Sequence, residues 1–456
     1  MTSENIVSSV KEASVIDRSL LETLQRERLH DLFVYARAHS PYLQKKYAKL
    51  PESPQLDEIP VSLRSELVGH FDDWVTDPEV KEDDVKKFLS DTNNIGTKFL
   101  GKYTVMTTSG TTGVPLIMLR DINHLTAHGA IMQERYRNGL LLRQVKGLED
   151  PQKIKACAII SPPGFHSAYM SYLGIKAQFK ASGKENDLLY LPVNTPLAEM
   201  EERLNAFQPD IVACYPSAMV VLALSQQAGR LNIHPKYIGC SAEQLSPPNR
   251  LLLEKTFGCP AIDNYCSTEG GEIALLCPKG HLHVNADWLI LEPVDAENKP
   301  VPTGQVSDGV LLTNLANRVQ PVIRYRLSDK ILWHDELCGC GITLPFIEVQ
   351  GREEEILIFE HGATKIPLSP TLFLLLVVDS NDCVAGQFIQ RSPLSLEVRY
   401  LAKEDCPRDR LATKLKTKLD EIFRCNGLPV QVIISDEPLV RTQKGGKIRS
   451  VFKEFL

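Results

Sequence analysis

The spacing of apolar side chains predicts a long helix near the amino terminus. Between residues 17 and 50 apolar positions recur at helical intervals and charged residues fill the gaps, which is typical of a helix with one buried face. The apolar stripe contains Leu20, Leu21, Leu24, Leu29, Leu32, Phe33, Tyr35 and Ala36. A polar stretch from Pro51 to Pro60 follows this helical region.

From residue 104 onward, short strand-like runs alternate with runs of helical spacing. This alternation predicts an α/β fold with a large layered body. The strand-like runs end in polar turns, which is where α/β sheets place ligands. The strand-like runs cover residues 155–160, 211–214, 237–240 and 261–265, and the helical runs cover residues 197–207 and 218–228.

The pattern changes twice in the second half of the chain. A series of strand-like runs predicts a β subdomain over about residues 284–350, and the pattern restarts after Arg352. We therefore expect a large N-terminal domain, residues 1–352, and a small α+β C-terminal domain, residues 353–456. The predicted strands are 288–291, 309–313, 322–325, 356–359, 396–400 and 430–434, with a helix over 408–423.

Composition narrows the function without defining it. The chain of 456 residues has 51 basic and 57 acidic residues, a net charge of -6, and no long basic run, which argues against nucleic acid as a partner and favours small ligands. Leu372–Val378 is the longest apolar run; it is too short to span a bilayer and predicts a buried element. The polar amino terminus and an odd count of 11 cysteines favour a cytoplasmic protein with no secretory signal and no membrane contact.

A hydroxyl-rich loop joins two predicted strands at residues 103–107 and 116–119. Its sequence, Thr108-Ser109-Gly110-Thr111-Thr112-Gly113, offers four hydroxyls and two glycines. Such a loop can turn backbone N–H groups inward and hold an anion without a fixed positive charge. It is not a Walker loop, because no Gly-Lys-Ser/Thr follows. The alternative is an ordinary solvated hairpin, which uses the same residue types.

Four further motifs follow this loop in order. Together with it they resemble the adenylate-forming superfamily of acyl-CoA synthetases, and most closely its phenylacetate-CoA ligase branch. The resemblance covers about residues 20–455 and implies ATP-dependent conversion of a carboxylic acid to acyl-AMP with release of pyrophosphate, then transfer to CoA. The motifs are residues 240–245, Cys-Ser-Ala-Glu-Gln-Leu; residues 264–270, Asn-Tyr-Cys-Ser-Thr-Glu-Gly; residues 324–329, Arg-Tyr-Arg-Leu-Ser-Asp, with Gly351-Arg352; and residues 444–449, Lys-Gly-Gly-Lys-Ile-Arg.

The resemblance assigns nucleotide-binding roles along the chain. The loop residues Thr108 to Gly113 would hold the β- and γ-phosphates of ATP. Ser241, Ala242 and Glu243 are expected to lie along adenine, and Tyr265 to pack on adenine. Asn264 and Thr268 belong to the same motif as Tyr265. Asp329 would bind the ribose, and Arg352 would bridge ribose and phosphate. Without the resemblance, Tyr265 would be interpreted as a core residue, Asp329 as a turn residue and Arg352 as a surface arginine.

Two residues carry the expected chemistry. Glu269 is a carboxylate suited to Mg²⁺, which binds through one or two carboxylates and phosphate oxygens; the alternative is a solvated turn glutamate. Lys447 would stabilise the charge that develops between the carboxylate and the α-phosphate; the alternative is a basic tail. In the family the C-terminal domain is mobile and rotates about a hinge, matched here by Glu354, so that Lys447 enters only for adenylation.

Four residues on two turns form a candidate structural zinc site. Cys277 and His283 lie on one turn, and Cys338 and Cys340 flank a glycine on another. Three thiols and one imidazole supply a tetrahedral ligand set, and we expect His283 rather than His281 as the fourth ligand. The alternative is a group of thiols without metal.

The sequence says less about which acid is the substrate and which molecule accepts the acyl group than about the nucleotide site. Phe165 and His166, with Tyr215, are candidate contacts of an aromatic or apolar acid, although a buried core uses the same side chains. The segment from Ile366 to Val378 departs from the phenylacetate-CoA ligase pattern, so transfer to an amine or amino acid, as in ligases resembling coronafacate ligase, stays open beside CoA. A non-catalytic nucleotide-binding homologue is a third alternative. The branch often forms dimers, and a homodimer is possible.

Overall fold

The computed structural model describes residues 3–108, 116–137, 145, 148, 154–350, 356–362, 364–378, 380, 382–403, 406–440 and 450–454. The chain divides into two compact units, which are described separately. Unit 1 comprises residues 1–107, 116–149 and 263–351. Unit 2 comprises residues 108–115, 150–262 and 352–456.

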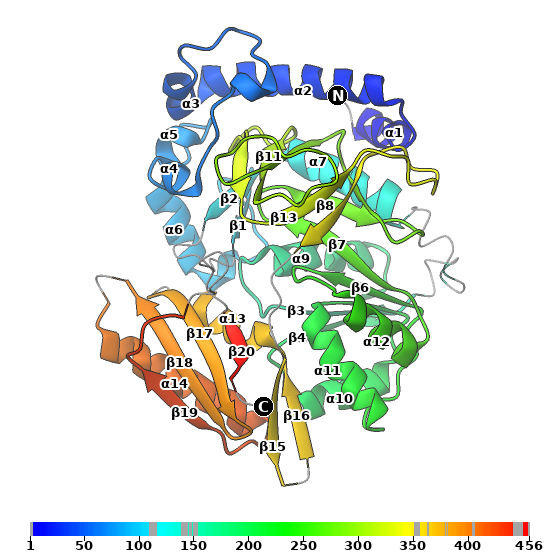
Figure 1. Cartoon of the computed structure of the whole chain (residues 1–456), viewed down its shortest axis with the longest axis vertical. Coiled ribbons are helices and arrows are strands. Elements are labelled where there is room, and N and C mark those ends of the chain that lie inside the picture. The colour runs from blue at the N-terminus through cyan, green and yellow to red at the C-terminus, as the bar shows by residue number, and fades with distance from the viewer. Residues whose placement is uncertain are drawn as a thin grey trace. The chain divides into compact units, whose positions relative to one another are not determined.

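Unit 1 begins with three helices, of which the apolar stripe over residues 17–50 predicts the second and third but not the first. They are α1 (Ser3–Ala13), α2 (Arg18–His39) and α3 (Pro41–Lys46), and α2 is the long blue helix in Figure 1. The predicted helical region is divided at Ser40, whose extended backbone ends α2 and whose hydroxyl accepts a hydrogen bond from Leu43 N at 3.2 Å. A side-chain cap followed by Pro41 starts a new helix and cannot continue the old one.

Shorter elements lead from these helices to the hairpin that flanks the hydroxyl-rich loop. The hairpin strands β1 (Thr104–Thr107) and β2 (Ile117–Arg120) pair antiparallel. Helix α7 (Ile122–Ile131) follows β2 and continues as a π-helical turn, Met132–Arg137. The preceding elements are η1 (Leu56–Glu58), α4 (Arg64–Val68), α5 (Phe71–Trp74), α6 (Glu82–Ser90) and η2 (Thr92–Asn94).

The remaining strands of unit 1 belong to two antiparallel sheets. In the first, strands pair in the order β13-β14-β9-β8-β7, and β7 starts two residues before the unit boundary. In the second, β11 lies between β10 and β12. The strands are β7 (Ala261–Ser267), β8 (Gly271–Leu276), β9 (Leu282–Val284), β10 (Leu289–Val294), β11 (Gly309–Asn314), β12 (Tyr325–Leu327), β13 (Lys330–His334) and β14 (Phe346–Gln350).

The strand predicted over residues 322–325 is wrong in its position. Strand β12 starts only at Tyr325, because Arg324 has a left-handed backbone with φ of 47°. The Arg324 side chain holds this conformation: it pairs with Glu292 at 2.9 Å and donates to the Ile59 carbonyl at 2.5 Å. A strained residue at a strand start is tolerated only where its surroundings fix it in this way.

The amino-proximal part of unit 2 is a parallel sheet with helices, as the alternating pattern predicts. Its strands pair in the order β6-β5-β3-β4, all parallel. Parallel strands are buried on both faces, so they have continuous apolar runs. The strands are β3 (Ala156–Ile160), β4 (Leu188–Pro192), β5 (Ile211–Cys214) and β6 (Tyr237–Ser241), and the helices are α9 (Ser167–Ala181), η5 (Glu185–Asp187), α10 (Leu197–Phe207), α11 (Pro216–Gln227) and α12 (Pro247–Phe257).

The carboxyl-proximal part of unit 2 has the predicted α+β composition. Helix α14 packs its apolar face, from Leu411 to Phe423, into one core with the four-stranded sheet β19-β18-β17-β20 (Figure 1). Leu372–Val378 lies in helix α13, and its residues Leu372, Phe373, Leu376 and Val377 are buried in the core, as expected. The elements are β15 (Leu357–His361), β16 (Thr364–Leu368), α13 (Pro370–Val378), β17 (Cys383–Ser392), β18 (Ser395–Ala402), α14 (Arg408–Cys425), β19 (Gln431–Ser435) and β20 (Val451–Lys453).

No helix in the described ranges is long and apolar enough to cross a membrane. The division into a large N-terminal and a small mobile C-terminal domain stays a prediction.

Candidate functional site

The hairpin formed by β7 and β8 carries the candidate magnesium ligand. Asn264 pairs with Leu275 and Tyr265 with Ala274, and the chain turns over Thr268–Gly270. The Gly270 N–H donates to Ser267 Oγ at 2.9 Å. Gly270 itself leaves no room for a side chain without movement of its neighbours, since an added Cβ would lie 3.1 Å from Ile273 and 3.2 Å from Leu312. The turn is therefore closely packed at position 270.

Glu269 is buried in this turn, with only 7% of its surface exposed. Burial raises the pKa of its carboxyl, while Arg64 and a hydrogen bond with Ser267 oppose this increase. A solvated turn glutamate would be exposed and would have no such increase of its pKa, so the alternative of an exposed glutamate does not describe Glu269. A divalent cation beside Glu269 would favour the ionised carboxylate, because an opposite charge lowers a carboxyl pKa.

Three side chains hold the turn from neighbouring elements. Arg120, at the end of β2, donates to the Thr268 carbonyl at 2.9 Å. Asn314, at the end of β11, donates to the Glu269 carbonyl at 2.9 Å. Asn285 donates to the Glu272 carbonyl at 2.8 Å. These residues lie outside the five predicted motifs, so the sequence analysis missed them.

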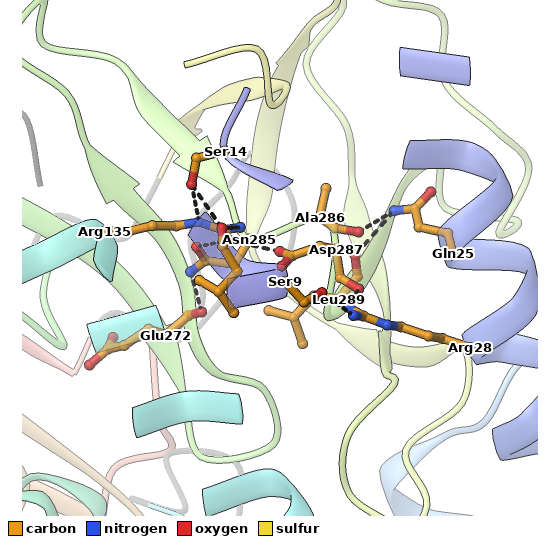
Figure 2. Close-up of polar contacts among 11 residues, drawn as sticks. Ser9, Ser14, Gln25, Arg28, Arg135, Glu272, Asn285, Ala286, Asp287 and Leu289 are labelled. Carbon is orange, nitrogen blue, oxygen red and sulfur yellow. Dashed lines mark hydrogen bonds and ion pairs between the residues drawn. The ribbon is translucent and has the colours of Figure 1, made fainter. Parts of the chain in front are cut away.

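Asn285 links the hairpin to the amino-terminal helices, as Figure 2 shows. The guanidinium of Arg135, in the π-helical turn, donates to Asn285 at 2.9 Å and pairs with Asp287 at 2.7 Å. Arg135 also donates to Ser14 Oγ at 3.0 Å. Both members of the ion pair are buried, with side-chain exposures of 5% and 0%. Arg135 also donates to the Val10 carbonyl at 3.0 Å, so the hairpin is supported by a polar network that reaches α1.

Two predicted nucleotide-binding residues of unit 1 are joined directly. The Tyr265 hydroxyl donates to Asp329 Oδ2 at 3.1 Å. Burial, with the nearby Asp329 charge, raises the pKa of Tyr265 well above its ordinary value, so the phenol stays a neutral donor. This bond orients one carboxylate oxygen of Asp329.

In unit 2, the predicted nucleotide-binding residues described by the structure are at the ends of strands. Thr108 is buried, and Ser241 is the last residue of β6. Ala242 has a left-handed backbone with φ of 68°. The Glu243 carboxylate accepts hydrogen bonds from Ser217 N at 2.9 Å and Ser217 Oγ at 3.0 Å, so it caps the first turn of α11.

The remaining nucleotide-binding and catalytic predictions lie outside the described residues. These are Ser109, Gly110, Thr111, Thr112, Gly113, Arg352, Glu354 and Lys447. Their roles continue to depend on the sequence resemblance.

The predicted acid-binding residues are in unit 2 and are close to an aromatic cluster. Phe165 and Tyr215 are buried, and His166 precedes α9. The Ser161 N–H donates to the Tyr215 hydroxyl at 3.1 Å, and the Tyr190 hydroxyl donates to the Ser161 carbonyl at 2.8 Å. The hydroxyls of Tyr215 and Tyr190 therefore both bond to the backbone of Ser161, directly after β3. Aromatic rings with hydrogen-bonded hydroxyls are typical of ligand sites, and they also occur in protein cores.

The four candidate zinc ligands of unit 1 are brought together. The ligand atoms of Cys277, His283, Cys338 and Cys340 all lie within 4.8 Å of one another. Cys277 Sγ is 3.6 Å from Cys338 Sγ, and Cys340 Sγ is 3.4 Å from His283 Nε2. His283 Nδ1 lies 2.7 Å from the Leu344 carbonyl, so it donates there and leaves Nε2 available as a ligand.

His281 is the competing imidazole. Its Nδ1 is 3.1 Å from Cys338 Sγ, and its ring stacks on Phe346 with centroids 4.4 Å apart. Of these two histidines, His283 is the one whose Nδ1 contacts a backbone carbonyl, and metal-bound histidines usually donate to such a group from the ring nitrogen that does not bind the metal. The donor set fits zinc: three thiolates and one oriented imidazole make a closed tetrahedral site.

No family model matches the chain. Protein CapK of Staphylococcus aureus is 24% identical over 420 residues, which cover 88% of this chain and 83% of that protein. A solved structure of 2-hydroxyisobutyryl-CoA ligase, in complex with 2-HIB-AMP and CoA in the thioesterification state, has a TM-score of 0.58. The match covers 97% of this chain and 91% of the ligase, at 18% identity.

This chain has the adenylate-forming fold. A second structure of the same ligase, in the postadenylation state with 2-HIB-AMP, has a TM-score of 0.57, 18% identity and the same coverage. The fold predicted from the five motifs is confirmed, whereas the phenylacetate-CoA ligase branch stays a prediction.

Proposed function

We propose that the protein uses ATP and Mg²⁺ to convert a carboxylic acid into an acyl adenylate, and then transfers the acyl group to CoA. The observation that carries this proposal is Glu269: a buried carboxylate in a closely packed, hydrogen-bonded turn, in the same unit as the Tyr265–Asp329 pair. The adenylate-forming fold and the order of the motifs support the same reaction.

The chemistry requires charge to be neutralised between two anions. An oxygen of the acid's carboxylate attacks the α-phosphorus of ATP, a mixed anhydride forms, and pyrophosphate leaves. Mg²⁺ held by Glu269 would reduce the repulsion between carboxylate and phosphates. Asp329, with one oxygen fixed by Tyr265, would accept hydrogen bonds from the ribose hydroxyls. The loop Thr108–Gly113 would hold the departing phosphates, and Lys447 the developing charge.

The test is acid-dependent exchange of labelled pyrophosphate into ATP, measured with a panel of aromatic and aliphatic acids. The wild type should show Mg²⁺-dependent exchange with at least one acid. Glu269→Gln should lower this exchange by at least about 100-fold, because removal of even a supporting residue of a metal site costs 10- to 100-fold. Glu297→Gln, an exposed turn glutamate of the same unit, is the matched control and should behave like the wild type.

Two results would contradict the proposal. Exchange by Glu269→Gln at the wild-type rate would remove Glu269 from the metal site. ATP binding without exchange for any acid would favour the alternative of a non-catalytic nucleotide-binding homologue.

The acceptor is a separate question with a separate measurement. Once an activated acid is known, product mass with CoA, or with amines and amino acids, distinguishes a thioester from an amide. The CoA thioester is our primary proposal, and the departure of residues 366–378 from the phenylacetate-CoA ligase pattern keeps the amide ligase as the second candidate.

We also propose a structural zinc ion at Cys277, His283, Cys338 and Cys340. The proximity of the four ligand atoms and the orientation of His283 support it. The ion would join the turn before β9 to the turn before β14 and would take no part in the reaction, since four protein ligands complete a tetrahedral site.

A further inference from the structure

Unit 1 contains an open cavity of about 390 Å³, which is large enough for a small organic ligand, since ligand pockets start at about 300 Å³. Five separate stretches line it: α2, the segment after α5, the residue before β1, the junction of β2 and α7, and the loop after β11. None of its described lining residues belongs to the five motifs. We call it the Arg318 cavity, and its polar lining residues include Tyr35, Thr76, Asp77, Tyr103, Asp121 and Arg318.

The positive charge of Arg318 has no counter-charge in the part of the chain that the structure describes. Its guanidinium carbon lies 5.2 Å from the centroid of the Tyr35 ring, and among the described residues no carboxylate oxygen pairs with it. Stacking on an aromatic ring stabilises the cation but occupies none of its N–H donors. A guanidinium in this state offers a planar fork that matches the oxygens of a carboxylate.

The loop that carries Arg318 is hydrogen-bonded on both sides. The N–H groups of Arg318 and Val319 donate to Asp121 Oδ2 at 2.7 and 3.0 Å. Thr76 Oγ1 donates to the Arg318 carbonyl at 2.9 Å, and the Thr76 N–H donates to the Val319 carbonyl at 2.9 Å. The backbone of Arg318 is therefore held in place without a ligand, which lowers the entropy cost of binding one.

The two carboxylates that line the cavity already have donors. Asp121 accepts from three backbone N–H groups, at the start of α7 and in the loop after β11. Asp77 accepts from the Tyr103 hydroxyl at 2.6 Å and pairs with Lys102 at 3.3 Å. Arg318 is therefore the charge that a ligand can neutralise. The nearby carboxylates disfavour a ligand with more than one negative charge, because like charges repel.

We propose that the Arg318 cavity binds a small aromatic carboxylic acid that carries a single negative charge. The carboxylate would accept hydrogen bonds from the Arg318 guanidinium, and the ring of the acid would lie against Tyr103, Pro78 and Val319, which line the same cavity. This site is additional to the acid-binding residues predicted in unit 2, and binding there requires neither ATP nor Mg²⁺. The inference therefore goes beyond the proposed function and does not depend on it.

The first test is titration calorimetry of the full chain without nucleotide, at about pH 8, with benzoate, benzamide and phenyl phosphate as probes. Benzamide keeps the shape of benzoate and lacks its charge, whereas phenyl phosphate is mainly a dianion at this pH. Benzoate should bind at least about 10-fold more tightly than either, because a charge-assisted pair is stronger than a neutral hydrogen bond and a dianion is repelled by the two carboxylates.

The variants assign this binding to the cavity. Arg318→Gln should lower the affinity for benzoate at least about 10-fold, and Arg318→Lys, which keeps the charge and loses the planar fork, should fall between it and the wild type. Arg26→Gln, an exposed arginine of α2 in the same unit, is the matched control and should bind like the wild type. Crystals soaked with 4-iodobenzoate should show iodine in the cavity of the wild type and none there in Arg318→Gln.

Binding that depends on the charge of benzoate and on Arg318, with iodine in the cavity, supports the inference whether or not the protein catalyses pyrophosphate exchange. Failure of the proposed function is therefore a separate result. If Arg318→Gln is misfolded by circular dichroism, Arg318→Lys and the wild-type crystals decide.

Four results would overturn the inference. The first is iodine found only at the residues predicted to bind the acid in unit 2. The second is iodine in the cavity without Arg318-dependent binding in solution, which would be binding at crystal concentration only. The third is benzoate binding no more tightly than benzamide or phenyl phosphate. The fourth is the absence of binding by all three probes.

Discussion

Three positions apart in one hairpin, Glu269 and Glu272 show how burial changes the chemistry of a single side chain type. Both carboxyls are withdrawn from water, and burial raises the pKa of each. Burial raises the pKa of Glu272 to about 7, and the positive charge of Arg120 opposes this increase. For His128, burial and the Arg120 charge act in the same direction and lower the pKa to about 3. At neutral pH the His128 imidazole is therefore neutral, whereas Glu272 titrates near this pH.

This shift predicts a pH-dependent stability difference. The pKa of Glu272 is raised from 4.5 to about 7 in the folded protein, so between these pH values the folded state binds more protons than the unfolded chain. Glu272 therefore destabilises the fold increasingly as pH rises from 4.5 to about 7. Glu272→Gln cannot ionise, so its stability relative to the wild type should increase over this window and level off above it.

Urea unfolding midpoints measured at several pH values between 4 and 8.5 check this expectation. Glu22→Gln, an exposed glutamate on α2, is the control and should show a constant difference. A flat difference for Glu272→Gln would contradict the shift. The comparison needs no knowledge of the substrate.

At the scale of elements, side chains from distant segments fix the position of functional turns. Arg120 from β2 and Asn314 from β11 hold the carbonyls of the turn that contains Glu269. Arg135 joins Ser14, which directly follows α1, to Asn285 and Asp287 (Figure 2). The amino-terminal helices are thus part of the support of the candidate site.

The zinc proposal makes a prediction about the turns before β9 and β14. Purified protein should contain about one zinc ion per chain, and Cys338→Ser should lose it and unfold at a lower temperature. A bound metal contributes its binding free energy to folding. The measurements are elemental analysis and thermal unfolding with and without a chelator. Cys425→Ser, an exposed cysteine of α14, should keep its zinc, and folded wild-type protein free of zinc would remove the site.

At the scale of the whole molecule, the proposed reaction has two steps with different requirements. In the adenylate-forming enzymes that the sequence resembles, the lysine at the position that we align with Lys447 serves the first step only, because their C-terminal domain rotates between the steps. Lys447→Ala should therefore lower pyrophosphate exchange on the order of 100- to 1000-fold, the usual cost of losing one group that stabilises transition-state charge.

The same variant should still complete the second step. Given chemically synthesised acyl adenylate and CoA, Lys447→Ala should form product at a rate near that of the wild type. Near-normal pyrophosphate exchange in this variant would defeat the assignment of Lys447. Loss of both steps would indicate misfolding, which circular dichroism would detect.

The local pattern of the sequence was enough for the fold class and most strands. Continuous apolar runs predicted the parallel strands β3, β5 and β6 because such strands are buried on both faces. The leucine spacing predicted α14. The pattern missed α7, whose buried positions include a histidine, and it could not anticipate the left-handed Arg324, because a distant glutamate holds that conformation.

The order of residues along the chain supplies the chemical groups, namely the hydroxyl-rich loop, Glu269, Asp329 and the four zinc-ligand candidates. Folding determines which of these groups meet. It joined Tyr265 to Asp329, brought the His283 ring to the Leu344 carbonyl, and placed Arg120, His124, His128 and Glu272 together. The spacing of apolar residues predicts which face of a single helix or strand is buried. Hydrogen bonds and pKa shifts depend instead on residues that folding brings together from different parts of the chain.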